Sequence, residues 1–305
     1  MLAQQWGWLV VLSILWGGSF FFVGVAVQDV PTLTLVLCRV GLAALVLLAV
    51  VWFRKQPLPG SMWQWMPFVV MALLNNIFPF SLMVLGQSEI ASGLASVLNA
   101  TTPLWAVMLA HVFTADEKLS VGRVAGVVLG VVGVSILIGP AVFNGETASV
   151  FGMVCVLGGA MSYGFAGVWG RRLRTTPPLV SATCQLICSS LLLLPVALSI
   201  DQPWNLPVPS ATVLLALAGL AVFSTAVAYL VFYHILTVSG STNVMLVTLL
   251  IPVSSILLGA AFLNEVLLPQ HFAGAGIIAA ALILFDGRLP AFLVRSIRSW
   301  RHQAG

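Results

Sequence analysis

Few residues inside the long apolar stretches of this sequence could carry out chemistry. Cys184 and Cys188 are four residues apart, so a helix would place both thiols on one face. The pair could seat a metal ion, but no His, Asp or Glu lies close by in sequence, and we favour packing as small apolar residues. The apolar stretches hold no HExxH motif, no paired acids and no Ser/His arrangement. The sequence therefore predicts neither an enzyme nor a metal or other cofactor.

Arg39 is the ionisable residue that lies most clearly inside an apolar stretch. Counted from Pro31, it lies about two helical turns, or roughly 10–12 Å, from the start of that stretch. An ionised group at such depth is costly, which makes it a candidate functional residue. Two interpretations remain open. The side chain could extend outward or pair with a carbonyl or with an acid such as Glu89, or it could act as a gate or attract a substrate carboxylate.

Uncharged polar and aromatic residues are more frequent, and several of them share a helical face. Tyr229 and Tyr233 are one helical turn apart, and Asn76 and Phe80 have the same spacing. An Asn side chain in lipid needs hydrogen-bond partners, so it should face the protein interior. Such residues could line a binding cavity or join helices to one another by hydrogen bonds, and the spacing alone allows both.

The composition indicates that these side chains are held by helices in a membrane. Hydrophobic residues make up 60% of the chain and charged residues 7%, with a mean hydropathy of +1.11. A soluble domain carries roughly a quarter charged residues, and a membrane span needs about 20 mainly apolar residues. We therefore predict an all-α integral membrane protein with ten transmembrane helices. The ten stretches are about 6–27, 32–53, 66–87, 91–113, 121–139, 150–170, 178–200, 210–236, 243–263 and 270–286.

The charged residues predict how the helices are oriented. Eleven of the twelve Lys and Arg residues fall at alternate loops or in the C-terminal tail of a ten-span chain, and all of them then lie on one side. The opposite loops carry Asp29, Glu89, Glu146, Asp201 and Glu265 but no Lys or Arg. The positive-inside rule places both termini in the cytoplasm. An error of one span would destroy this segregation, so the charges also favour the count of ten.

One sequence pattern occurs twice, about 148 residues apart. Pro103 precedes Glu117 by fourteen residues, and Pro252 precedes Glu265 by thirteen. A glycine follows each acid by nine residues. Because the two copies belong to halves with an odd number of spans each, the halves must have opposite orientations in the membrane. We therefore predict two inverted five-helix repeats, an architecture typical of secondary transporters.

The predicted domains follow from this repeat. The first five-helix repeat spans residues 1–139, and the second, inverted five-helix repeat spans residues 150–286. The remaining residues, 287–305, form a basic tail whose apolar side chains would lie near one helical face. We expect this amphipathic tail to lie along the cytoplasmic surface of the membrane.

The chain resembles the drug/metabolite transporter superfamily in its repeated pattern, in the opening segment LWGGSFFFVGVAV and in the segment LCRVGLAALVLL of the next span. More narrowly, it resembles the EamA-type exporters over about residues 6–286. In general appearance it is similar to bacterial exporters of aromatic amino acids of the YddG type. It departs from the family at the segment TADE, where a glycine more often precedes the acid, so the turn there could differ locally.

The resemblance implies a central cavity near the middle of the membrane, lined by the first, third, fourth, sixth, eighth and ninth spans. We expect polar and aromatic residues of these spans to bind the substrate. Such a cavity is aromatic and polar but nearly uncharged, which suits a zwitterion with a sizeable apolar side chain. The expected substrate-binding residues are Asn76, Phe80, Asn99, Tyr163, Tyr229, Tyr233 and Thr248, with Trp16 and Trp169 as further lining residues.

Five residues are candidates for gating or for a structural role. Pro103 and Pro252 remove a backbone hydrogen bond and permit their helices to bend. Glu117 and Glu265 would stabilise the positive N-terminus of a following helix, which we favour over a role in coupling. Arg39 completes the set.

The resemblance implies a secondary transporter of the bacterial inner membrane that exports small metabolites by alternating access. Amino acids with aromatic or bulky apolar side chains are the expected substrates, and other small metabolites or drug-like amines are the alternative. A membrane-embedded enzyme is disfavoured because no catalytic motif is found, and saturation of the flux would distinguish a carrier from a channel. The expected partners are a small-molecule substrate and the lipid bilayer, without nucleic acid. We expect the protein to function as a monomer.

Overall fold

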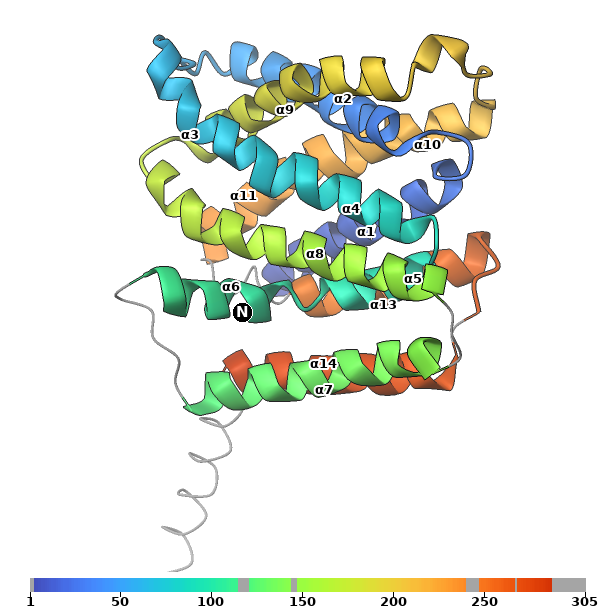
Figure 1. Cartoon of the computed structure of the whole chain (residues 1–305). Helices are drawn as coiled ribbons and strands as arrows, with labels where there is room; N and C mark the ends of the chain where they lie inside the picture. The colour runs from blue at the N-terminus through green and yellow to red at the C-terminus, as the bar shows by residue number, and fades with distance from the viewer. Residues whose placement is uncertain (1–2, 115–120, 144–146, 240–246, 267, 287–305) are drawn as a thin grey trace, which may run out of the picture.

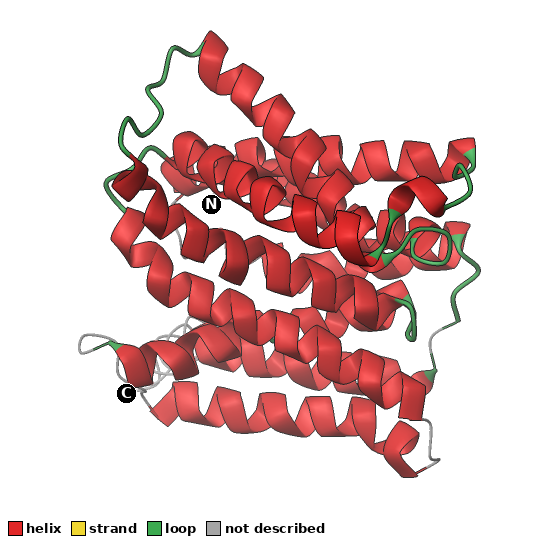
Figure 2. Cartoon of the chain, turned by 45° about the horizontal axis from the view of Figure 1, so that its top comes forward, coloured by secondary structure: helices red, strands yellow, loops and turns green. Residues whose placement is uncertain are grey.

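The structure is a bundle of helices without a β-strand in its described residues (Figures 1 and 2). It is a computed structural model that describes residues 3–114, 121–143, 147–239, 247–266 and 268–286. The longer helices are apolar on all faces, as expected of helices surrounded by other helices and lipid rather than by water.

In the described residues, seven helices run without interruption and three stretches are divided. The uninterrupted helices are α1 (Ala3–Ala26), α2 (Thr32–Phe53), α7 (Val121–Phe143), α8 (Thr147–Trp169), α9 (Pro178–Ile200), α13 (Val247–Phe262) and α14 (Pro269–Asp286). The divided stretches are α3 (Met62–Ala72) with α4 (Phe78–Gln87), α5 (Ser92–Asn99) with α6 (Thr102–Phe113), and α10 (Ala211–Ala221) with α11 (Ala228–Ser239). Short 3₁₀ turns cover Gly170–Leu173 and Pro203–Asn205.

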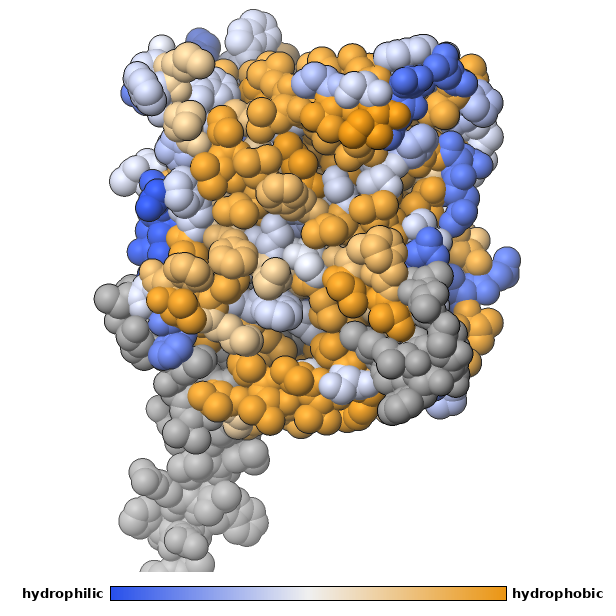
Figure 3. Space-filling model, in the orientation of Figure 1, coloured by the Kyte–Doolittle hydropathy of each residue, from blue (hydrophilic) through white to orange (hydrophobic). Residues whose placement is uncertain are grey.

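By length and composition, seven helical stretches of the described residues can cross a membrane: Gln4–Ala26, Thr32–Phe53, Met62–Gln87, Ser92–Phe113, Ser149–Leu173, Pro178–Ile200 and Ala211–Val238. Two shorter apolar helices cover Val124–Leu137 and Leu250–Phe262. The hydrophilic surface gathers mostly towards the left and right edges of Figure 3, where the helices end, and apolar surface covers much of the face between them. The prediction of an all-helical multi-pass membrane protein is confirmed, whereas the count of ten spans in two repeats stays a prediction.

Two of the divided stretches contain a π-helical turn. One, η1 (Leu73–Ile77), joins α3 to α4, and the other, η4 (Val222–Val227), joins α10 to α11. A π-turn lengthens the hydrogen-bond ring and leaves carbonyls without their usual donors. Hydroxyl groups provide the missing donors: Ser162 Oγ donates to the carbonyl of Leu74 at 2.7 Å, and Thr225 Oγ1 donates to that of Leu220 at 2.9 Å.

The third divided stretch breaks between α5 and α6. Pro103 is at the second position of α6, where its missing N–H is not needed by the helix. Thr101 Oγ1 donates to the carbonyl of Leu98, and Thr102 Oγ1 donates to that of Asn99, both at 2.7 Å. These bonds satisfy carbonyls at the end of α5, so the break can persist inside an apolar environment.

The helices pack in a small set of pairs. Helix α7 packs along α14, and in Figure 1 the two form a layer of their own below the others. Helix α2 packs on α9, α1 on α13 and α11, and α8 on α4 and α6. Glycines allow close approach in the α7–α14 pair, since a Cβ at Gly274 would lie 3.1 Å from the carbonyl oxygen of Gly133.

Candidate functional site

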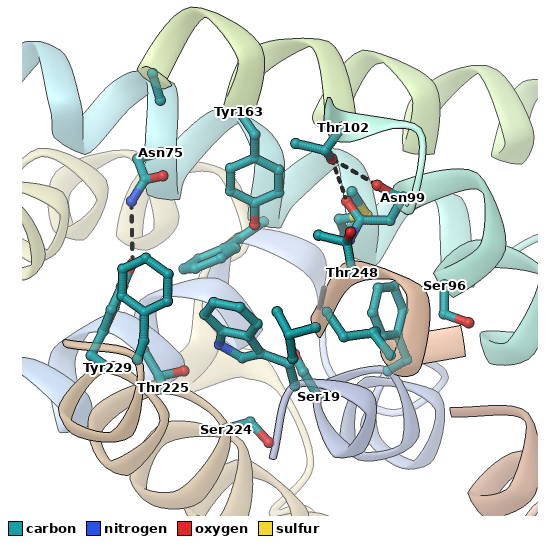
Figure 4. Close-up of a pocket in the computed structure, with 18 of the residues that line it drawn as sticks. Ser19, Asn75, Ser96, Asn99, Thr102, Tyr163, Ser224, Thr225, Tyr229 and Thr248 are labelled. Atoms are coloured by element: carbon teal, nitrogen blue, oxygen red, sulfur yellow. Dashed lines mark hydrogen bonds between the residues drawn. The ribbon is translucent and has the colours of Figure 1, made fainter. Parts of the chain in front are cut away.

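A cavity of about 460 Å³ lies inside the bundle (Figure 4). Helices α1 to α6, α8, α9, α11 and α13 contribute to its wall, as do both π-turns and the break between α5 and α6. None of the described residues of α7, α10 or α14 lines it. The cavity is therefore formed where the divided helices depart from regular α-helical geometry.

Most of the residues that the sequence nominated for substrate binding line this one cavity. They come from α1, α4, α5, α8, α11 and α13, which are far apart in the chain and are brought together by the packing. Arg39 from α2 also lines it. The nominated residues in the wall are Trp16, Phe80, Asn99, Tyr163, Tyr229, Tyr233 and Thr248.

Asn76 and Trp169 are exceptions, because the structure places both outside the wall. Asn76 has 0% of its surface exposed, and its Nδ2 donates to Ser189 Oγ at 2.9 Å. The indole of Trp169 donates to the carbonyl of Pro67 at 3.1 Å and packs against a separate apolar cluster around α3 and α9. Both residues join helices to one another, and neither is in the described wall of this cavity.

Several polar lining residues were not nominated from the sequence. Asn75 takes the place expected of Asn76, because the π-turn η1 shifts which of two adjacent residues faces the cavity. The signal available in the sequence was only that these residues are polar within apolar stretches. The further polar lining residues are Ser19, Gln87, Ser96, Thr102, Gln185, Ser224 and Thr225.

Aromatic rings make up a continuous part of the wall. Tyr229 and Tyr233 stack with ring centroids 6.1 Å apart and an angle of 14° between the rings. Phe232 lies edge-on to Tyr233 at 5.3 Å and contacts Trp16 at 5.5 Å. The rings of α11 and α1 thus provide apolar faces against which an aromatic or bulky apolar ligand can pack.

A hydrogen-bonded network fixes the polar side of the cavity. Asn75 Nδ2 donates to Gln185 Oε1 at 3.1 Å and to the hydroxyl oxygen of Tyr229 at 3.2 Å (Figure 4). The Tyr229 hydroxyl in turn donates to Asn76 Oδ1 at 3.3 Å, and Gln185 Nε2 donates to Ser181 Oγ at 3.0 Å. This network connects η1, α9 and α11, so it holds the tyrosine ring in a defined position against the cavity.

Arg39 is the charged residue of the wall, and it is 7% exposed. Its Nε donates to Thr225 Oγ1 at 3.0 Å, and its guanidinium carbon lies 3.6 Å from the centre of the Phe80 ring. The sequence left open a pairing with a carbonyl or with Glu89, and the structure shows a hydroxyl and an aromatic ring instead. Burying a cation costs of order several kcal/mol, and one hydrogen bond to an uncharged hydroxyl with one cation–π contact offsets only part of that cost.

Glu265 lies away from the cavity and caps a helix from the other half of the chain. Its carboxylate accepts hydrogen bonds from the backbone N–H of Ser92 at 2.8 Å, from the Ser92 hydroxyl at 2.9 Å and from the N–H of Gly93 at 3.1 Å. Asn264, with a φ of 54°, makes the turn that brings the carboxylate there. Glu265 thus lies at the N-terminus of a helix, but that helix is α5 rather than the helix that follows Glu265 in the chain.

The other residues nominated for gating have different outcomes. Pro103 stands at the break between α5 and α6, and Pro252 lies inside α13. Glu117 and the tail 287–305 lie outside the described residues. The structure therefore leaves the roles of Pro252, Glu117 and the tail as predictions.

The wall favours non-covalent binding of a small amphipathic molecule. No Asp or Glu is among the described lining residues, and the described residues contain no group of three His, Cys, Asp or Glu side chains that could hold a metal ion. The available groups are aromatic faces, amide and hydroxyl groups, and one guanidinium. Such a site can bind and release a ligand with an apolar body and a small polar end.

The model of the EamA-like transporter family matches this sequence twice, over residues 6–139 and over residues 150–285. The chain belongs to this family. The resemblance to EamA-type transporters predicted from the sequence is confirmed, whereas the aromatic amino acid exporter type stays a prediction. The chain is therefore an EamA-family membrane transporter of small substrates.

Two bacterial transporters and a solved structure are similar to this chain. The transporter is 24% identical over 283 residues to the uncharacterized inner membrane transporter YedA of Escherichia coli (strain K12), covering 93% of this chain and 90% of YedA. It is 26% identical over 163 residues to the uncharacterized transporter YoaV of Bacillus subtilis (strain 168), covering 53% of this chain and 56% of YoaV. A protein crystal structure superposes with a TM-score of 0.63 at 18% identity, over 91% of this chain and 95% of the other, which shows the fold alone.

Proposed function

We propose that this transporter exports small amphipathic metabolites, in the first place amino acids with aromatic or bulky apolar side chains, by alternating access through the central cavity. The observation that carries the proposal is the cavity of about 460 Å³ with aromatic walls and a few fixed polar groups. Small-molecule sites typically measure roughly 300–1,000 Å³ and share this distribution of apolar and polar groups. An aromatic side chain would pack against Trp16, Phe80 and Tyr233, and its polar end would meet Asn75 or Asn99.

The proposal includes ten transmembrane helices arranged as two inverted repeats, residues 1–139 and 150–286. The family model matches each half separately. The π-turns η1 and η4 occupy corresponding places in the two halves. Several helix pairs correspond between the halves, since α1 packs on α13 and α11 as α8 packs on α6 and α4. In the α2–α9 and α7–α14 pairs, one helix comes from each half. Labelling of introduced cysteines that placed the chain ends on opposite faces would contradict this arrangement.

We assign the chain to the bacterial inner membrane with both termini in the cytoplasm. The segregation of Lys and Arg in the sequence supports this orientation, and the relative YedA is named an inner membrane transporter. We also propose that the protein works as a monomer. Its partners are the transported small molecule and the surrounding lipid.

Counterflow in proteoliposomes tests the proposed substrate. Vesicles loaded with unlabelled phenylalanine should accumulate labelled phenylalanine or tryptophan from outside, and the initial rate should saturate with concentration because a carrier must bind each molecule. Vesicles without protein provide the background. A panel in which aromatic amino acids are not carried while aliphatic amines are would overturn the proposed substrate class. A rate that rises linearly without saturation would point to a channel instead.

A further inference from the structure

Arg39 offers hydrogen-bond donors to the cavity and has no acidic partner in the part of the chain that the structure describes. Among the described residues its contacts are the hydrogen bond from Nε to Thr225 Oγ1 and the approach of its guanidinium carbon to the Phe80 ring. These contacts use one nitrogen and one face of the guanidinium group. The two terminal amino groups donate no hydrogen bond to a described residue, although the side chain is 7% exposed and lines the cavity.

A purely structural role explains only part of this arrangement. Arg39 anchors α2 to η4 through its hydrogen bond to Thr225, and it packs on Phe80. A shorter, uncharged polar side chain on α2 would make a hydrogen bond to Thr225 without burying a charge. A buried cation is costly unless an opposite charge and further hydrogen bonds compensate it. The unused amino groups therefore indicate that the partner of Arg39 is a molecule that enters the cavity.

Tyr163 completes the surroundings of this charge. Its ring projects into the cavity from α8 (Figure 4), and its hydroxyl group donates no hydrogen bond to a described residue. The charge of Arg39 lies near enough to Tyr163 to interact with it electrostatically. Tyr229, which is also near Arg39, has its hydroxyl occupied by Asn75 and Asn76. The free phenol and the guanidinium together present several donors and no acceptor with a negative charge.

We propose that Arg39, assisted by the hydroxyl group of Tyr163, binds a carboxylate of the transported molecule, and that the carboxylate rather than an amine is the charged group the cavity requires. This inference rests on the proposed function, and it narrows the substrate class to small carboxylates with an aromatic or bulky apolar body, with or without an amino group. The planar guanidinium matches a carboxylate through two parallel hydrogen bonds. An ammonium group would find uncharged oxygens and aromatic faces among the described lining residues but no carboxylate, and it would be repelled by Arg39.

The test compares four molecules that share a phenyl ring and differ in charge: phenylalanine, 3-phenylpropionate, phenylalaninamide and 2-phenylethylamine. Each is added to the purified protein in detergent at neutral pH, and the shift of the unfolding temperature reports binding. Phenylalanine and 3-phenylpropionate should both raise the unfolding temperature, whereas the amide and the amine should bind about 10- to 100-fold more weakly because they lack the anion.

The possible outcomes separate this inference from the proposed function. If all four molecules stabilise the protein equally, or if the two amines do so best, the carboxylate site is wrong while transport of aromatic molecules remains supported. If phenylalanine alone binds, the ligand needs its amino group as well as its carboxylate, and the proposal that the carboxylate is the required charged group is wrong. If none of the four binds at any concentration tried, both the proposed substrate class and the inference are overturned.

Variants at Arg39 locate the effect. Arg39→Gln should abolish the preference for 3-phenylpropionate over phenylalaninamide, and Arg39→Lys should keep the preference for the anion with weaker binding, because the charge remains but the paired geometry is lost. Arg54→Gln removes an exposed charge from the end of the same helix and should leave the preference unchanged. If Arg39→Gln does not fold, Arg39→Lys and the series on the unaltered protein still decide the question. An unchanged preference in a folded Arg39→Gln protein would overturn the proposal.

Discussion

Two adjacent asparagines show how the role of a residue is decided at the level of single side chains. Asn75 lines the cavity and donates to Gln185 and Tyr229. Asn76 is fully buried and joins Ser189 to the same tyrosine. Both are amides in an apolar helix, so their chemistry is the same, and only the direction in which each side chain points differs. One residue is positioned to meet the ligand, and the other to hold the wall.

Replacing each asparagine by alanine should separate these two roles. Asn76→Ala should lower the free energy of unfolding by about 1–2 kcal/mol, because two interhelical hydrogen bonds are lost and their partners stay buried. Asn75→Ala should weaken substrate binding or raise the KM of counterflow with a smaller loss of stability. Thermal unfolding in detergent and initial counterflow rates measure the two effects. The assignment is wrong if Asn76→Ala alters KM at full stability while Asn75→Ala leaves KM unchanged.

At the scale of helices, the π-turns decide which residues reach the cavity. The turn η1 precedes Pro79, whose missing N–H already prevents a regular helical bond there. The turn η4 lies in a segment without proline, and the Thr225 hydroxyl that satisfies the Leu220 carbonyl is also the group that receives the bond from Arg39. The irregular backbone and the charged group of the wall are therefore linked through one threonine.

A second feature at this scale, the glycine contact between α7 and α14, permits a test with an internal control. Gly274→Ala adds a methyl group that would meet Leu137 and the carbonyl of Gly133, so it should cost about 1–3 kcal/mol of stability through overpacking. Gly276→Ala lies on the same helix with no atom within 4 Å of the added carbon, so it should be neutral or slightly stabilising. Thermal unfolding in detergent compares the two variants. Equal stabilities would show that the helices do not depend on this close approach.

For the whole molecule, a carboxylate holds together the two segments that match the family model. Glu265 belongs to the second segment, and Ser92 and Gly93, which it caps, belong to the first. Ser255 adds a further link, since its hydroxyl donates to the carbonyl of Ser92 at 3.2 Å. The N-terminus of α5 is thus fixed to the end of α13 by contacts that join residues far apart in the chain.

Removing this carboxylate should loosen the connection between the two segments. Glu265→Ala should lower the free energy of unfolding by about 1–2 kcal/mol, because the N–H groups of a helix start lose a charged acceptor. Glu89 is an exposed acid near the end of α4, and Glu89→Ala should change the free energy of unfolding by less than about 0.5 kcal/mol. The comparison is made by thermal unfolding of both variants in the same detergent. A loss of stability as large in Glu89→Ala as in Glu265→Ala would contradict the capping role.

The sequence was sufficient to predict an all-helical multi-pass membrane protein and insufficient for the direction of individual side chains. Apolar stretches and charge segregation depend on whole segments, so they indicate a helical membrane protein without knowledge of contacts. Tyr229 and Tyr233 could be placed on one face because α11 is regular. Asn75 rather than Asn76 lines the cavity, and apolar periodicity does not reveal the residue that the π-turn adds there. The outcome for Trp169 depended on a carbonyl of α3, a contact between distant segments that no local pattern encodes.

No acid among the described residues pairs with Arg39, and this has a consequence for how voltage acts on the protein. In a carrier whose cavity opens first to one side and then to the other, an uncompensated positive charge experiences a different share of the membrane potential in each state. One elementary charge moved through about 100 mV changes the free energy by about 2.3 kcal/mol. A bound anion would neutralise that charge, so the potential would act mainly on the return of the empty carrier, and the turnover rate would depend on voltage even without a coupling ion.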